Sequence, residues 1–215
     1  MNKIYCFWTG TNEMSIARLK GLDKLRCTSE CEVILVTPEN LNEFISKPIH
    51  PAYEYLSLVH RSDYLRAYFM HYIGGGYSDI KPGIHSWRNA FESLEKYSVI
   101  GYKEVGSGAV AQCFNKPGMR KKLQDNWRLL VGCGAFICNP NTEFTQEWLD
   151  EVNKLLTYNL NLLKKHPGNI LGDNEGYPLN WTELLGDIFH PLVLKHRNEI
   201  LQNDFIKPDF TKIYR

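Results

Sequence analysis

The sequence lacks any apolar run long enough to cross a membrane, because a spanning helix needs about 20 predominantly apolar residues. Its amino terminus also lacks the apolar segment of a secretory signal peptide, since the run from Ile4 to Trp8 has only the length of a strand. We therefore expect no membrane span in this chain and a cytoplasmic location.

A charge excess of either sign is missing as well. The 215 residues have a formal net charge of +1 at pH 7, with 25 Lys and Arg against 24 Asp and Glu. Domains that coat DNA or RNA usually have a clear basic excess. The composition therefore gives no reason to expect a nucleic-acid partner.

Cysteines are few and are not grouped as metal ligands. Cys27 and Cys31 are close in sequence, but no second pair of Cys or His follows at the spacing of a zinc site. We expect all six to be reduced and mostly buried thiols of an intracellular protein. They are Cys6, Cys27, Cys31, Cys113, Cys133 and Cys138.

The residues that are present suit a packed core: 43% are hydrophobic and 13% aromatic. Apolar runs predict strands at 4–8, 32–36, 77–80, 98–102, 109–113 and 134–138. Helical periodicity and capping residues predict helices at 15–25, from 37, at 60–72, 119–130 and 142–164, and from 181. This alternation predicts a single α/β domain over residues 1–215, a Rossmann-like fold whose central sheet is mainly parallel and flanked by helices.

Two short segments contain the candidate chemistry. Asp63 and Arg66 are three residues apart on one side of a predicted helix, a spacing that by itself indicates only a surface ion pair. Three glycines, Gly74 to Gly76, then allow a tight turn and lead through a short strand to Asp79. Open α/β sheets bind ligands at such strand ends, where a carboxylate can hold a divalent cation and the cation a diphosphate.

The order Ser-Asp-x-x-Arg, a helical spacer and Gly-Gly-x-Tyr-x-Asp resembles the sugar-binding region of GT-A glycosyltransferases with a DXD motif. The most similar types are the family 32 and capsular-polysaccharide-synthesis enzymes and the glucosylating bacterial toxins. The resemblance extends to transferase domains encoded by algal viruses. For a virus-encoded protein, the expected cytoplasmic location would be the cytoplasm of the host cell. Phe7-Trp8-Thr9-Gly10 is similar to the aromatic-Trp-x-Gly opening of these families. The resemblance covers residues 4–81 well and the rest loosely.

The resemblance implies a GT-A domain that transfers a hexose-type sugar from a UDP-sugar to a glycan or glycoprotein acceptor, with retention of configuration. By the same resemblance, Trp8 would stack on the uracil and Thr9 would belong to the same nucleotide site. Asp63 and Arg66 would hold hydroxyls of the donor sugar or ribose. Asp79, as the first acid of DXD, would contact the metal or the ribose.

The chain departs from the motif at Lys81, which stands where the second acid of DXD is expected. In one interpretation Mn²⁺ or Mg²⁺ is held by Asp79 and His190, and Lys81 touches phosphate. In the other, Lys81 supplies the positive charge and no metal is needed. We expect the metal-bound form, with Asp79 and Lys81 as the catalytic pair.

Two other functions remain open at this point. A module that binds a nucleotide-sugar or glycan without turnover would explain the loss of the second acid. A metal-dependent hydrolase of nucleotide-sugars would use the same pocket, with water in place of the acceptor.

Overall fold

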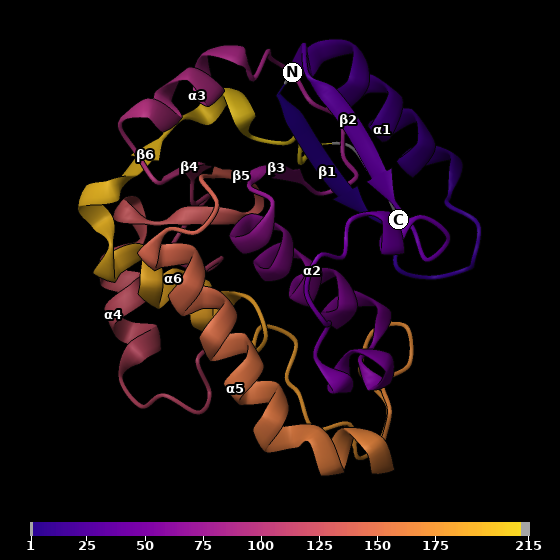
Figure 1. Ribbon diagram of the computed structural model, residues 1–215. Coiled ribbons are helices and arrows are strands. Elements are labelled where there is room, and N and C mark those ends of the chain that lie inside the picture. The colour runs from indigo at the N-terminus through magenta and orange to yellow at the C-terminus, as the bar shows by residue number, and fades with distance from the viewer. Residues whose placement is uncertain (1, 212–215) are drawn as a thin grey trace.

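The centre of the fold is a six-stranded sheet of order β2-β1-β3-β5-β4-β6, seen in a computed structural model that describes residues 2–211 (Figure 1). β1 pairs in parallel with β2 and β3, and β4 with β6, whereas β5 runs antiparallel to β3 and β4. The predicted mainly parallel α/β sheet is therefore confirmed. The strands are β1 (Lys3–Phe7), β2 (Glu32–Val36), β3 (Gly75–Ser78), β4 (Val99–Lys103), β5 (Val131–Cys138) and β6 (Ile200–Gln202).

Helices cover both faces of the sheet because its strands are apolar on both sides. Along β1, Ile4 and Cys6 pack into a smaller core with α1 and α3, and Tyr5 and Phe7 pack into a larger one with α2, α5 and α6. The helices are α1 (Ile16–Ser29), α2 (Leu58–Tyr72), α3 (Arg88–Glu92), α4 (Met119–Asp125), α5 (Glu143–Lys165) and α6 (Gly186–Lys195).

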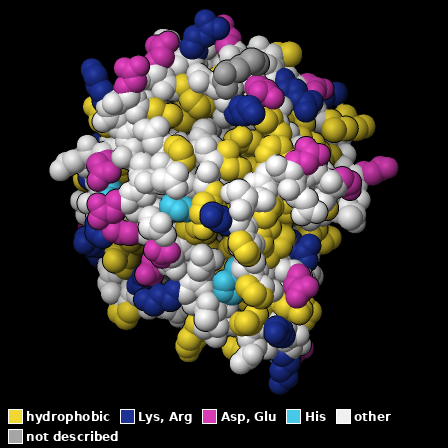
Figure 2. Space-filling model, viewed as in Figure 1, with side chains coloured by type: hydrophobic (Ala, Val, Ile, Leu, Met, Phe, Trp, Pro, Cys, Tyr) yellow, Lys and Arg dark blue, Asp and Glu magenta, His cyan; other side chains and the backbone are white. Residues whose placement is uncertain are grey.

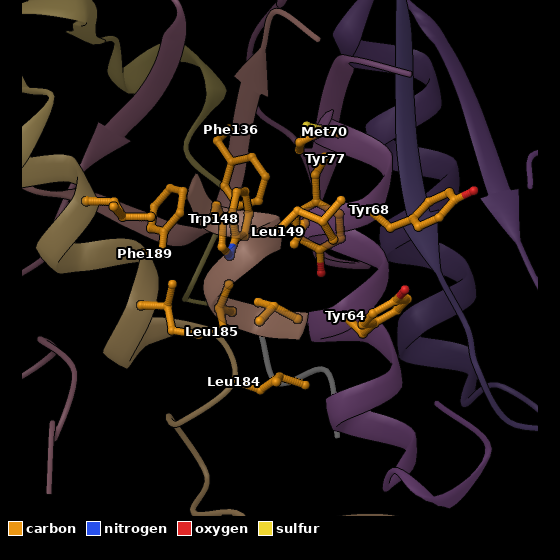
Figure 3. Close-up of a cluster of buried hydrophobic side chains, with 14 of the residues drawn as sticks. Tyr64, Tyr68, Met70, Tyr77, Phe136, Trp148, Leu149, Leu184, Leu185 and Phe189 are labelled. Carbon is orange, nitrogen blue, oxygen red and sulfur yellow. The ribbon is translucent and has the colours of Figure 1, made fainter. Parts of the chain in front are cut away.

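Aromatic side chains fill the larger core where α5 and α6 meet the sheet (Figure 3). Phe136 of β5 lies 5.5 Å from Trp148 of α5 and 5.2 Å from Phe189 of α6, measured between ring centroids. All three side chains are fully buried, and such aromatic pairs add to the stabilisation that burial provides. This core fixes α6 against β5, and both elements contribute residues to the candidate site described below.

Three predicted elements are wrong in the structure. The helix predicted from Thr37 is a turn, because the Asn40 side chain accepts from the Thr37 N–H and donates to the Leu35 carbonyl, and only a short 3₁₀ helix follows at Leu41–Glu43. Residues 109–113 form no strand, since the Ala111 N–H donates to His190 instead of to a neighbouring strand.

The third error concerns the last helix, which begins at Gly186 and not near residue 181. Residues 181–185 form turns in which the Thr182 carbonyl accepts from the N–H groups of Leu185 and Asp187. The sequence also gave no indication of β6, because three residues are too few to show an alternating pattern.

The surface in Figure 2 has basic and acidic side chains interspersed over the visible face. On that face, basic and acidic side chains are mixed and do not form separate basic and acidic regions. Among residues 2–211, no helix combines the length and the apolar character needed to cross a membrane.

Two glycines of β5 make room for Tyr102 of β4. A Cβ atom at Gly132 would lie 2.1 Å from Cζ of Tyr102, and one at Gly134 would lie 3.1 Å from its hydroxyl and 3.3 Å from Oδ2 of Asp79. The Gly134 N–H also donates to the Tyr102 hydroxyl at 3.3 Å. The glycines thus let Tyr102 and Asp79 lie directly over the backbone of β5.

We predict that Gly132→Ala lowers the free energy of unfolding by about 1–3 kcal/mol, because the added methyl group must displace the buried Tyr102 ring. Urea denaturation followed by circular dichroism measures the change. Gly106→Ala is the matched control, since a Cβ there meets no atom within 4 Å. Equal urea midpoints for the two variants would contradict the prediction.

Candidate active site

A cavity of about 340 Å³ opens at one edge of the sheet, where β3 and β4 end and β5 begins. Because β5 is antiparallel to both neighbours, its first residues lie beside the last residues of β3 and β4. α2 and α6 supply further walls of the cavity. Six acidic, basic or histidine side chains line it, namely Asp63, Arg66, Asp79, Lys81, Glu104 and His190.

Asp79 is the most heavily contacted carboxylate of the cavity. Its Oδ1 accepts from the Tyr77 hydroxyl at 2.7 Å and from Arg66 Nη2 at 3.4 Å, and its Oδ2 accepts from Lys81 Nζ at 2.6 Å. Burial favours the protonated form, but Arg66, Lys81 and Tyr77 outweigh burial and hold the pKa of Asp79 below its ordinary value. Asp79 is therefore an ionised acceptor whose two oxygens both face cations.

Arg66 joins α2 to the end of the sheet. Nη1 donates to the Cys133 carbonyl at 3.1 Å, Nη2 lies 3.5 Å from Asp63 Oδ1, and the guanidinium lies 4.3 Å from the centre of the Tyr77 ring. The Asp63 and Arg66 side chains are only 5% and 11% exposed, so their pair is buried and not the surface pair that the spacing alone indicates. Burial raises the pKa of Asp63, and Arg66 opposes that rise.

Lys81 is also buried and contacts Oδ2 of Asp79, whereas Arg66 contacts Oδ1. Its ammonium group is 4.7 Å from the centre of the Phe210 ring, within the range of a cation–π contact. The cavity therefore has two buried cations around one carboxylate.

His190 lies in the same cavity, but its contacts are with Glu104 and Cys133. Nδ1 accepts from the Ala111 N–H at 3.1 Å, and Nε2 lies 3.2 Å from Glu104 Oε2 and 3.4 Å from Cys133 Sγ. Burial disfavours the charged ring, while Cys133 and Glu104 raise the pKa of His190. The Ala111 N–H limits that rise because it requires an unprotonated Nδ1, which leaves Nε2–H as the donor to Glu104.

Trp8 and Thr9 follow β1 and are not among the residues that line the cavity. The Trp8 ring is half-buried, its Nε1 donates to the Asn12 carbonyl at 2.7 Å, and the Arg18 guanidinium lies 5.5 Å from the ring centre. The Thr9 hydroxyl donates to the Leu58 carbonyl at 2.6 Å, next to the start of α2. Their roles in nucleotide binding stay predictions.

Sequence reasoning missed several residues of the cavity wall, among them Tyr102, Glu104, Trp181 and Phe210. Glu104 directly follows β4 as Asp79 follows β3, so the argument from strand ends could have found it. Trp181 and Phe210 are 54% and 42% exposed, and only the folded chain brings them to the cavity from distant positions in the sequence. No sequence signal pointed to either.

Comparison with solved structures places this arrangement in a known fold. A chain described as "PaToxG Glycosyltransferase" is similar over 90% of this chain and 69% of its own length, with a TM-score of 0.51 and 14% sequence identity. No family model and no curated protein matches the chain. The chain therefore has a glycosyltransferase fold, and membership of family 32 stays a prediction.

Proposed function

We propose that the protein transfers a hexose-type sugar from a UDP-sugar to a glycan acceptor, with retention of configuration as the sequence resemblance implies. The observation that carries the proposal is the arrangement around Asp79 in a glycosyltransferase fold. A strand-end carboxylate is held between the buried cations Arg66 and Lys81, at the side of an open cavity.

The proposed reaction explains why two buried cations are useful. Transfer breaks the bond between the sugar C1 and the diphosphate oxygen, and negative charge develops on the departing UDP. Lys81 and Arg66 are already in place to stabilise that charge in a partly desolvated site, where fixed charges act more strongly than in water. Arginine in particular suits phosphate oxygens because its guanidinium can donate two parallel hydrogen bonds.

The expected divalent cation fits these residues poorly. Both oxygens of Asp79 face Arg66 or Lys81, and His190 is engaged by Ala111 and Glu104. Neither Asp79 nor His190 belongs to a group of three closely spaced metal-ligating side chains among residues 2–211. We therefore propose that Lys81, with Arg66, takes the place of the metal, and the pair Asp79 and His190 stays an untested alternative.

Aromatic side chains support the proposal of a carbohydrate acceptor. Trp181 and Phe210 line the cavity and remain roughly half exposed. Exposure of such large apolar side chains to water is unfavourable, so a ligand that covers them would be stabilised. Such rings offer flat apolar faces with polar groups nearby, which suits the mixed character of a sugar ring.

Calorimetric titration of the protein with UDP, in EDTA and in Mn²⁺, tests the proposal. We expect binding in both buffers with similar affinity, because the charges that neutralise the diphosphate belong to the protein. Binding that requires Mn²⁺ would instead favour the metal-bound form. Absence of UDP binding in both buffers would refute the UDP-sugar assignment. If UDP binds but the protein releases no UDP from any UDP-hexose, the result would favour a non-catalytic module.

A further inference from the structure

A second group of ionisable side chains lies outside the cavity, where the start of α5 meets the end of α6. Glu143 is the first residue of α5, His196 directly follows α6, and Glu199 ends a short 3₁₀ helix, Arg197–Glu199, before β6. One potential ligand atom from each of the three side chains lies within 4.8 Å of the other two. Two segments of the chain, the start of α5 and residues 196–199 after α6, thus converge on one small space.

The negative charges of this group are only partly balanced by neighbouring side chains. Among the described residues, neither Glu143 nor Glu199 forms a salt bridge with a lysine or arginine. Lys195 forms its ion pair with Glu147 at 2.5 Å, although the charge of Glu143 also acts on it. Two carboxylates held this close repel each other, and a bound cation would remove that repulsion.

The histidine has the surroundings of a metal ligand. His196 is only 6% exposed; its Nδ1 faces Glu199 Oε1 at 3.3 Å, while its Nε2 lies 3.4 Å from Glu147 Oε2 without hydrogen-bond geometry. Ligating histidines in proteins almost always direct their second nitrogen at a carboxylate or carbonyl, which orients the ring. Nδ1 would therefore be the coordinating atom, and Glu147, which faces Nε2, would orient the ring.

We propose that Glu143, His196 and Glu199 bind a divalent transition-metal ion, with Zn²⁺ as the best match. One imidazole nitrogen and two carboxylate oxygens, completed by water, form a set that Zn²⁺ accepts in tetrahedral geometry. The imidazole favours Zn²⁺ over Mg²⁺ and Ca²⁺, which prefer oxygen ligands alone. The ion would connect α5, α6 and the segment before β6, and so stabilise the fold independently of sugar transfer.

Calorimetry and thermal unfolding of the full chain with Zn²⁺, after treatment with EDTA and dialysis, test this site. We expect one Zn²⁺ per chain, and a rise in Tm of about 5 °C or more at a free Zn²⁺ concentration about 100 times the Kd. Mg²⁺ at the same concentration should leave Tm unchanged. No binding of Zn²⁺, or an equal effect of Mg²⁺, would overturn the proposal.

Variants separate this site from the six cysteines, which could also bind Zn²⁺. Glu143→Gln and Glu199→Gln should each weaken Zn²⁺ binding at least about 10-fold. Loss of a residue that merely orients a metal ligand typically has an effect of that size, and loss of a ligand should have no smaller one. Glu151→Gln, on the exposed side of α5, is the matched control and should bind as the wild type does. Undiminished binding by both Glu143→Gln and Glu199→Gln would place the ion elsewhere. Glu143→Gln and Glu199→Gln should leave UDP binding unchanged. Failure of the metal-site proposal can therefore be distinguished from failure of the proposed sugar transfer.

Discussion

Asp79→Asn should lower kcat/KM for sugar transfer by about 100- to 1000-fold, the range seen when one fixed electrostatic contact of an active site is removed. The amide keeps the size of the side chain but has no charge. Arg66 and Lys81 then lose the carboxylate that fixes their positions in the cavity. The release of UDP from a UDP-hexose, with and without a glycan acceptor, measures the loss.

The same substitution should also destabilise the protein, by up to about 3–5 kcal/mol, because the buried Lys81 loses its ion pair with Asp79 and Arg66 loses one of its two carboxylate partners. Activity must therefore be compared at a temperature where circular dichroism shows the variant folded. Asp125→Asn removes a surface carboxylate paired with Lys121 and is the control; it should cost less than about 1 kcal/mol and leave activity unchanged. A folded Asp79→Asn variant with wild-type activity would refute the role of Asp79.

Lys81→Asp should make UDP binding depend on a metal ion. The substitution restores the second acid of the DXD pattern and removes the cation that we propose to neutralise the diphosphate. In EDTA, the affinity for UDP should fall at least about 10-fold, the equivalent of 1.4 kcal/mol. Mn²⁺ should restore much of it, because two neighbouring carboxylates favour a divalent cation.

Lys81→Met separates the loss of a cation from the gain of a ligand. Methionine is also long and flexible, but it has neither charge nor a carboxylate, so Mn²⁺ should not restore the affinity of this variant. If wild-type binding already needs Mn²⁺ and Lys81→Asp leaves that requirement unchanged, Lys81 does not replace the metal. Titrations that combine Mn²⁺ with these variants should use the Glu143→Gln background, to exclude ions held at the second site.

The sequence was informative wherever the signal is local. Strand and helix periodicities predicted most elements, because burial imposes a spacing of two or 3.6 on the apolar residues of any one element. The position of Asp79 near a strand end was also predictable from adjacent residues, although the strand predicted at 77–80 spans Gly75–Ser78 and includes two of the glycines. The failed predictions lie in segments such as 109–113, whose backbone bonds to a side chain far along the sequence.

The candidate site shows the same division between local and distant information. The spacing of Asp63 and Arg66 placed them on one side of α2, but not in the interior. Their burial depends on β5, whose Cys133 carbonyl accepts from Arg66 although the two residues are 67 positions apart. Helical spacing specifies only which side chains face the same way, and neighbouring elements decide whether that side meets water or protein.

By itself, then, the sequence determined the α/β class, the approximate positions of most strands and the location of Asp79 near the end of one of them. Only the tertiary structure decided that β5 runs antiparallel between β3 and β4, which brings Tyr102 and Glu104 to the same edge as Asp79. It also decided that Lys81 pairs with Asp79 in the interior and that His196 meets Glu143 and Glu199. The physical reason is that local periodicity is set within one element, whereas strand order and burial are set by packing between elements that are distant in the chain.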